Sequence, residues 1–279
     1  MKIKLISLCI FLNFLHPIGL RALVIPQTAS LLSQSGAGIS NSSLVNPALL
    51  LNENNHVSFS RNSWLGGIVG QKISLLSKNK IYISFETLSV TDIELRDEIA
   101  SDSPIGLFGA YWYALEFNKA MFIADDFNLG YKVKINFSKL YTETMKGYTI
   151  DLGANKLINK NLSIGFIIKN FGEEYSSNLN VHNTPTYGLG LNYNIDDYRL
   201  ILISDLLNQN SENVLKFAIQ TNLPLGINFI FGTTYSENYK DFSVGIKLDL
   251  AGWSLIYGNL NHNNPILGNP SSIEIKKYF

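Results

Sequence analysis

The chain has 279 residues, of which 46% are hydrophobic, 12% are aromatic and only 16% are charged, whereas charged residues make up about a quarter of a typical soluble domain. Its 22 basic and 22 acidic side chains cancel, so no net charge favours nucleic acid as a partner. A single closed β architecture can use this whole length as one domain.

Residues 1–22 have the layout of a secretory signal peptide. Lys2 and Lys4 precede a short apolar run, Pro17 follows it, and Ala22 offers a cleavage site. An uncleaved anchor helix is the alternative, although the run is shorter than the about 20 residues that span a bilayer. The only cysteine of the chain lies within this segment, so the mature protein would contain neither a disulfide nor a cysteine-ligated metal.

The next stretch, residues 23–54, contains the sequence SNSSLVNPALLL. Its serines offer helix caps, and Pro47 suits the first turn of a helix. We interpret residues 23–54 as a short helical plug, or hatch, at the periplasmic mouth of the barrel predicted below, with Asn46 and Pro47 fixing its bend. The side chains expected to pack inside the barrel are Leu44, Leu49, Leu50 and Leu51. The alternative is a connector that covers one end of a sheet.

From residue 55 onward, apolar and polar residues alternate. In FNLGYKVKINFS, at 127–138, the aromatic and aliphatic residues share one face and the lysines the other, which predicts a strand with one apolar face. We predict about 14 such strands, with 12 possible, most of about ten residues, the length that a tilted strand needs to cross a bilayer. Residues 55–279 are therefore predicted to form an all-β, antiparallel transmembrane barrel. The predicted strands lie near residues 55–62, 67–76, 80–88, 108–118, 127–138, 147–157, 161–171, 184–194, 198–205, 213–222, 225–236, 241–250, 252–260 and 271–279.

Short and long links between these segments tend to alternate. SKNK, LINKN, NIDD, NLPL and LAGW are tight, whereas links such as SVTDIELRDEIASDSPIGLF are long; the first link and the fourth, NKAMFIADD, break the pattern. Outer-membrane barrels have short periplasmic turns and long outer loops. The alternation therefore predicts the bacterial outer membrane as the location and its lipid as a partner. A soluble exported β protein, such as an adhesin domain, is the alternative, but it gives no reason for sorted links.

The chain ends directly on an amphipathic strand, SIEIKKYF, with Phe279 as its last residue. A terminal aromatic residue on such a strand resembles the signal that the bacterial barrel-assembly machinery recognises, so this machinery is an expected partner. An ordinary last strand that happens to end in Phe is the alternative.

A barrel of this size encloses a lumen, which its polar face would line. The polar residues expected to face the lumen are Lys132, Lys134, Asp151, Lys247, Asp249 and Glu274. Because both signs of charge occur among them, we expect ion pairs across the lumen rather than a strongly ion-selective pore.

The sequence offers no constellation for catalysis. No HExxH, Walker or G-x-S-x-G motif occurs. The mature histidines His56, His182 and His262 are far apart in the sequence, and the paired acids of the links fit solvated turns better than metal sites. We therefore expect no enzyme activity, no cofactor and no metal site.

The stretch IPQTASLLSQSGAGISNSSLVNPALL resembles the N-terminal block of the PorV/PorQ family of outer-membrane proteins, which are related to the FadL-type transporters. Asn46, Pro47 and Ala48 match the Asn-Pro-Ala motif of that family, and Leu49-Leu50 resembles the PorQ branch. LGYKVKINFSKLYTE, YTIDLGANKLINKNLSIGFIIKNFG and PTYGLGLNY follow in the family's order, the second ending in Lys-Asn-x-Gly at 169–172. The chain departs from the family in replacing a twin-glycine LGG block with SGAGISNSS and in being shorter.

This resemblance implies a FadL-like barrel with an N-terminal segment inside its lumen. It also implies a non-enzymatic binding scaffold in type IX protein secretion and surface attachment, with components of that system as partners. The alternative function is a FadL-like channel for the uptake of hydrophobic small molecules. That alternative predicts an apolar pocket beside the plug, formed with Leu44, Leu49 and Leu50.

Overall fold

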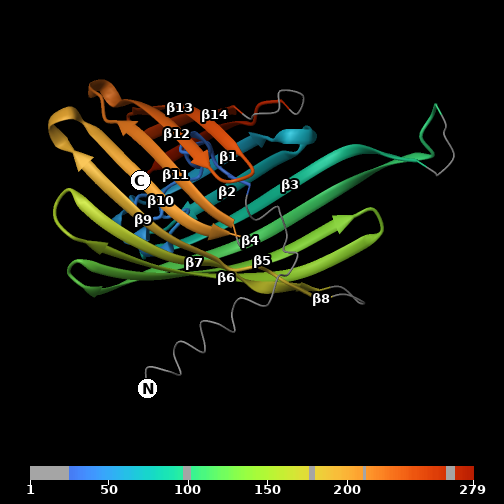
Figure 1. Ribbon diagram of the computed structural model, residues 1–279, viewed down its shortest axis with the longest axis horizontal. Coiled ribbons are helices and arrows are strands. Elements are labelled where there is room, and N and C mark those ends of the chain that lie inside the picture. Colours follow the sequence, from blue (N-terminus) through green and yellow to red (C-terminus); the bar gives the residue numbers. More distant parts are fainter. Residues whose placement is uncertain (1–24, 97–101, 176–179, 210–211, 262–267) are drawn as a thin grey trace, which may run out of the picture.

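The computed structural model describes residues 25–96, 102–175, 180–209, 212–261 and 268–279. The predicted signal peptide at 1–22, with Cys9, and His262 lie outside the described residues. The described part is almost entirely β-structure (Figure 1). None of its helices is both long and apolar enough to cross a bilayer.

Fourteen strands of the described chain close into an antiparallel barrel, as predicted. Each strand pairs with its neighbours in the sequence, β1 pairs with β15, and β6 pairs with β7, so the ring has no free edge. A short additional strand, β8 (Asn180–His182), pairs only with the end of β7. The barrel strands are β1 (His56–Ser63), β2 (Val69–Leu76), β3 (Ile81–Leu95), β4 (Gly106–Ala124), β5 (Phe127–Leu140), β6 (Glu143–Leu157), β7 (Leu162–Tyr175), β9 (Thr186–Ile195), β10 (Leu200–Gln209), β11 (Glu212–Thr221), β12 (Ile227–Tyr235), β13 (Lys240–Leu250), β14 (Trp253–Asn261) and β15 (Ser271–Tyr278).

Two predicted links are largely strand in the structure. The fourth link is a turn at residues 125–126 only, because β4 continues through Met121, which pairs with Leu129. Much of the long third link belongs to β3 and β4, which extend farthest at the right of Figure 1. Backbone pairing does not require an apolar face once a strand has left the bilayer, so a polar segment such as 89–95 remains in the ladder.

Six tight turns lie together at one end of the barrel, which is the periplasmic end in outer-membrane barrels. At the other end the link between β5 and β6 contains only residues 141–142. The expected alternation of short turns and long loops is therefore only partly correct, because longer strands supply much of the outer length. The tight turns are residues 77–80, 125–126, 158–161, 196–199, 222–226 and 251–252, and they include the short 3-10 helices η4 (Asp196–Tyr198) and η5 (Pro224–Gly226).

The distribution of side chains is the reverse of that in a soluble protein. Phe85 and Leu115 point outward and are 46% and 50% exposed, whereas the neighbouring Glu86 and Glu116 point inward and are 1% exposed. An apolar outer surface on a closed sheet suits lipid, because every backbone group is paired within the barrel. The fold is that of a transmembrane barrel of the bacterial outer membrane.

Residues 25–55, which we call the plug, lie inside the barrel and then lead into β1. Figure 1 shows this segment in blue, enclosed by the strands. Its helix α2 (Ala29–Ser33) contacts β13, β14 and β15, and its 3-10 helix η2 (Pro47–Asn52) contacts β4, β5 and β6. At the outer end, the 3-10 helix η3 (Leu65–Gly67) forms the link between β1 and β2.

Candidate functional site

The bend of the plug is organised by the side chain of Asn46. Its Oδ1 accepts a hydrogen bond from Ala48 N at 3.0 Å and so caps η2. Its Nδ2 donates to Ile39 O at 2.7 Å and to Ala154 O of β6 at 2.9 Å. The amide therefore joins two parts of the plug to the wall, while Pro47 begins the helix, where its missing N–H costs nothing.

Two glycines of the wall allow this motif to approach closely. Gly130 of β5 and Gly153 of β6 are register partners. A Cβ at Gly130 would lie 2.3 Å from the carbonyl carbon of Pro47, and one at Gly153 would lie 2.0 Å from Asn46 Oδ1. Both distances are far below van der Waals contact, so only glycine permits the observed packing. The Asn-Pro-Ala motif is thus matched to two glycines on different strands.

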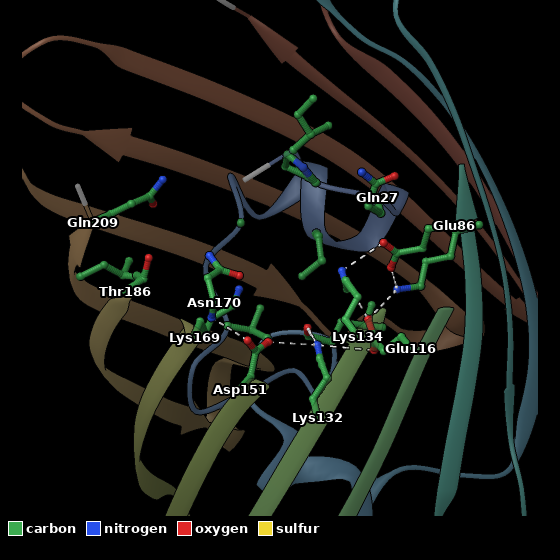
Figure 2. A pocket seen from close by; sticks show the side chains of 18 of the residues that line it. Gln27, Glu86, Glu116, Lys132, Lys134, Asp151, Lys169, Asn170, Thr186 and Gln209 are labelled. Carbon is green, nitrogen blue, oxygen red and sulfur yellow. Dashed lines mark hydrogen bonds and ion pairs between the residues drawn. The ribbon is translucent and has the colours of Figure 1, made fainter. Parts of the chain in front are cut away.

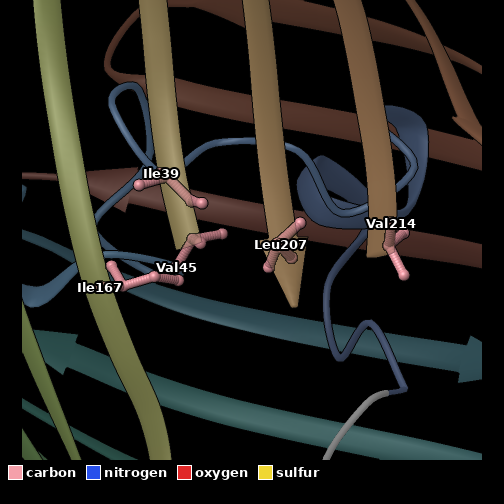
Figure 3. Packing of buried hydrophobic residues seen from close by; sticks show 5 residues of the cluster. All are labelled: Ile39, Val45, Ile167, Leu207 and Val214. Atoms are coloured by element: carbon pink, nitrogen blue, oxygen red, sulfur yellow. The ribbon is translucent and has the colours of Figure 1, made fainter. Parts of the chain in front are cut away.

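Apolar side chains of the plug pack against inward-facing wall residues. Leu50 is fully buried in a cluster with Leu76, Tyr82 and Ala120, against which Leu44 and Leu51 also pack. A second cluster contains Ile39 and Val45 of the plug together with Ile167, Leu207 and Val214 of the wall (Figure 3). These contacts remove apolar surface from water on both sides of the plug, at about 25 cal/mol for each Å².

Leu44, Leu49 and Leu50 do not share the apolar pocket that was expected around them. Leu50 is enclosed in its cluster, Leu44 lines a cavity in the outer half of the lumen, and Leu49 lines a different hollow near the tight turns. Consecutive residues of a 3-10 helix point about 120° apart, so Leu49 and Leu50 cannot face the same space.

Charged wall residues hold the plug at several points, of which three have the most direct contacts. The carboxylate of Asp205 accepts hydrogen bonds from Gly38 N at 2.6 Å and from Ile39 N at 3.1 Å. The carboxylate of Glu274 accepts from Ser30 N at 3.0 Å and from Ser30 Oγ at 2.7 Å. Lys132 Nζ donates to Leu44 O at 2.9 Å. Hydrogen bonds to charged groups contribute about 1.5–3 kcal/mol each, so each of these contacts is strong.

A continuous ion-pair network covers one side of the lumen (Figure 2). Lys72 pairs with Glu86, and Lys134 lies 3.1 Å from Glu86 and 3.6 Å from Glu116. Lys132 lies 3.4 Å from Glu116 and, at the far end of the network, 3.8 Å from Asp151. Three lysines and three carboxylates therefore balance one another across five adjacent strands, β2 to β6, in keeping with the expected ion pairs.

The remaining predicted lumen residues lie elsewhere on the inner face. Lys247 and Asp249 form a partly exposed ion pair of 2.9 Å on β13, close to the turn at 251–252. Glu274 lies 3.2 Å from Lys276 as well as contacting the plug. Phe279 is 59% exposed, and its backbone N donates to Asn55 O at 3.2 Å, next to the start of β1.

A cavity of about 110 Å³ lies between the outer side of the plug and the wall. It combines apolar side chains from the plug, such as Leu31, with the ion-pair network and with two further lysines, Lys169 and Lys216. A second hollow, of about 350 Å³, lies near the tight turns and is lined by the acids of the turn at 125–126 and by asparagines such as Asn155. The plug thus has an open space on each side.

An irregular part of the wall presents Lys169 to the cavity. The pairing of β6 with β7 shifts register between Ile150 and Leu152, and Asn170 adopts a left-handed conformation with φ of 61°. The Oδ1 of Asp151 accepts a hydrogen bond from Asn170 N at 2.8 Å, which stabilises this bulge. The sequence identified Lys169 only as part of the family motif at 169–172, and it did not identify Lys216. Neither lysine stands in a local pattern that indicates a binding site.

The described residues contain no group of three or more histidine, cysteine or acidic side chains that could hold a metal ion. The lumen is instead a set of polar and charged groups that can hydrogen-bond or pair with a solute.

Comparison with known proteins identifies the fold. No family model matches the chain. No curated protein matches it either. The toluene transporter TodX of Pseudomonas putida matches with a TM-score of 0.60 at 8% identity, over 89% of this chain and 96% of that chain. A deltaS2S3 mutant of the TodX monoaromatic hydrocarbon channel matches with a TM-score of 0.57 at 10% identity, over 86% and 94%. The chain therefore has the same barrel fold as TodX.

Proposed function

We propose that this protein is a plugged outer-membrane channel for small molecules. The observation that carries the proposal is a lumen with an open space on each side of the plug, 110 Å³ on the outer side and 350 Å³ near the tight turns. The likeness in fold to TodX, a toluene transporter, supports it. Passage would require the plug to move, since it fills the space between the two hollows.

The way in which the plug is held favours such movement. Its helices are short, five residues in α2 and six in η2, so little regular structure has to be broken. Side-chain hydrogen bonds link it to the wall at separate points, among them Asp205, Glu274 and Lys132. A cargo that replaced a few of these contacts would release part of the plug without disturbing the ladder of the barrel.

The cavity supports a small polar or amphipathic cargo better than a wholly hydrophobic one. Charged side chains such as Lys134 and Glu116 form much of its lining, next to apolar residues such as Leu31 and Leu207. An uncharged hydrocarbon would displace water from these buried charged groups and offer them no hydrogen bond in return, which is costly. A channel of this kind catalyses no reaction, and we propose no catalytic residue.

Locking the plug to the wall tests the proposal. Ser35 Oγ of the plug lies 2.7 Å from Ser243 Oγ of β13, so Ser35→Cys with Ser243→Cys should form a disulfide. We expect oxidation to abolish solute uptake by reconstituted liposomes and reduction to restore it. The matched control is Ser58→Cys with Ser74→Cys, because these hydroxyl oxygens lie 2.6 Å apart within the wall. Uptake that is unchanged by the plug disulfide, or lost equally in the control, would contradict the proposal.

A role as a binding scaffold in type IX secretion is the second candidate, and the sequence resemblance favours it. The motif that carries the resemblance is buried against wall glycines, so a partner would have to bind elsewhere. The outer ends of β3 and β4 offer one surface, where Ile105 and Leu107 are 65% and 61% exposed. Affinity purification from native membranes tests this role: recovery of secretion components supports it, and a barrel without partners counts against it.

A further inference from the structure

We infer that Lys169 and Lys216 form a binding site in the outer cavity for a small oxyanion, of the class of dicarboxylates and phosphate. The inference deepens the proposed function, because it assigns a charge to the cargo. Only the role of the ligand as cargo rests on that function. Binding itself can be tested without transport.

The lining of the cavity carries an excess of positive charge. Five lysines line it, against three carboxylates. Lys72, Lys132 and Lys134 are committed to those carboxylates in the network described above. Within the described ranges, Lys169 and Lys216 have no ion-pair partner, so both ammonium groups are available to a ligand. An anion placed between charged groups in a partly desolvated space offsets part of the cost of their lost hydration.

The nearest carboxylates do not neutralise these two lysines. Asp205 directs its oxygens to backbone amides of the plug, at 2.6 Å from Gly38 N and 3.1 Å from Ile39 N. Asp151 accepts from Asn170 N at 2.8 Å and lies 3.8 Å from Lys132. Both acids reduce the local positive potential, but their closest donors are these amides and Lys132, and neither acid lies within ion-pair distance of Lys169 or Lys216.

The two lysines come from separated strands and line the same space. Lys169 lies at the bulge of β7, beside Asn170, whereas Lys216 lies on β11 and reaches the plug, with its Nζ 3.4 Å from Gly36 O. That contact uses at most one of the three ammonium donors. Thr186 and Gln209 also line the cavity, and Figure 2 shows them on the same side as Lys169, away from the network of Lys134. The site therefore offers two cations with neutral hydrogen-bonding groups beside them.

The size of the cavity limits the ligand. A closed, dry cavity of about 150 Å³ accepts benzene. The cavity here is smaller but not closed, so its 110 Å³ can hold phosphate, or the carboxylate groups of a short dicarboxylate whose carbon chain extends into the open part of the lumen. Because donors approach from different strands, an anion with several acceptor oxygens satisfies more of them than a single carboxylate does. Succinate and inorganic phosphate share this chemistry.

Calorimetric titration of the full-length barrel in a non-ionic detergent tests the site. The probes are succinate, inorganic phosphate and succinamide, which resembles succinate in shape but is uncharged. We expect at least one oxyanion to bind at one site for each barrel and succinamide not to bind. Lys169→Gln and Lys216→Gln should each weaken binding at least about tenfold, the effect of one hydrogen bond to a charged group. Lys156→Gln is the control, because Lys156 is exposed and lies near the tight turns.

Each outcome decides the inference. Binding of succinate alone or of phosphate alone supports the site and identifies whether it takes a dicarboxylate or phosphate. No binding of either anion up to millimolar concentrations, equal binding of succinamide, or an equal loss in Lys156→Gln would overturn it. The disulfide experiment on the plug measures transport and does not measure binding. A barrel that binds anions but transports nothing would therefore refute the channel and keep the site, and the opposite result would refute only the site.

Discussion

The carboxylate of Asp205, on β10, accepts a 2.6 Å hydrogen bond from the backbone amide of Gly38, which lies 167 residues earlier in the plug. The same carboxylate accepts from Ile39 N. Asp205→Asn should loosen the plug, because the amide keeps one acceptor oxygen but turns an N–H group toward a backbone N–H. Loss of a charged hydrogen bond costs about 1.5–3 kcal/mol, so we expect faster solute entry in liposome-swelling assays.

Asp197→Asn serves as the control for that substitution, because Asp197 lies exposed in the turn η4. It should leave swelling rates unchanged. If Asp205→Asn behaves like the control, the carboxylate does not hold the plug closed.

Gly130→Val should displace the plug without opening the barrel. A Cβ at this position would lie 2.3 Å from Pro47 C and 2.4 Å from Ala48 N, so backbone has to move. The strand ladder is unaffected by the side chain, and the folded protein should keep its altered gel mobility before boiling while small solutes leak through. Gly106→Val is the matched control, because a Cβ there meets no atom within 4 Å. Equal leakage in the two variants would argue against this packing.

Glu116→Gln should destabilise the barrel more than an exposed substitution does. Glu116 lies within 4 Å of three lysines and is 1% exposed, and removal of one partner from a buried network costs about 3–5 kcal/mol. Asp126→Asn breaks the exposed pair with Lys156 and should cost at most about 1 kcal/mol. Denaturant midpoints measured in detergent compare the two, and similar midpoints would show that the network contributes little.

Deletion of residues 25–50 should leave a barrel that inserts but leaks small solutes. The strands pair only with one another around the ring, so the wall does not need the plug to close. Reconstitution and swelling assays measure the leak. Unchanged permeability would show that the segment does not occlude the lumen.

Much of the fold follows from local sequence. The alternation at 127–138 predicts a strand with Lys132 and Lys134 on the inner face, since side chains along a strand alternate between its two sides. Asn46-Pro47 similarly predicts the start of a helical turn, because capping and the fixed φ of proline act within a few residues. Fourteen segments of this kind predict a barrel and the bacterial outer membrane.

The candidate site depends on relationships that no local pattern contains. Whether a lysine on the inner face has a partner depends on the register of neighbouring strands: Lys132 is paired with Asp151 across β5 and β6, whereas Lys169 lies at a bulge and Lys216 comes from β11, on another part of the wall. The contact of Asp205 with Gly38 requires the ring to close around the plug. Strand periodicity is local, so the residue pattern alone predicts the wall and the residues that face the lumen. Which charges are balanced and which remain for a ligand depends on the closed barrel, because electrostatic pairing depends on distances across it.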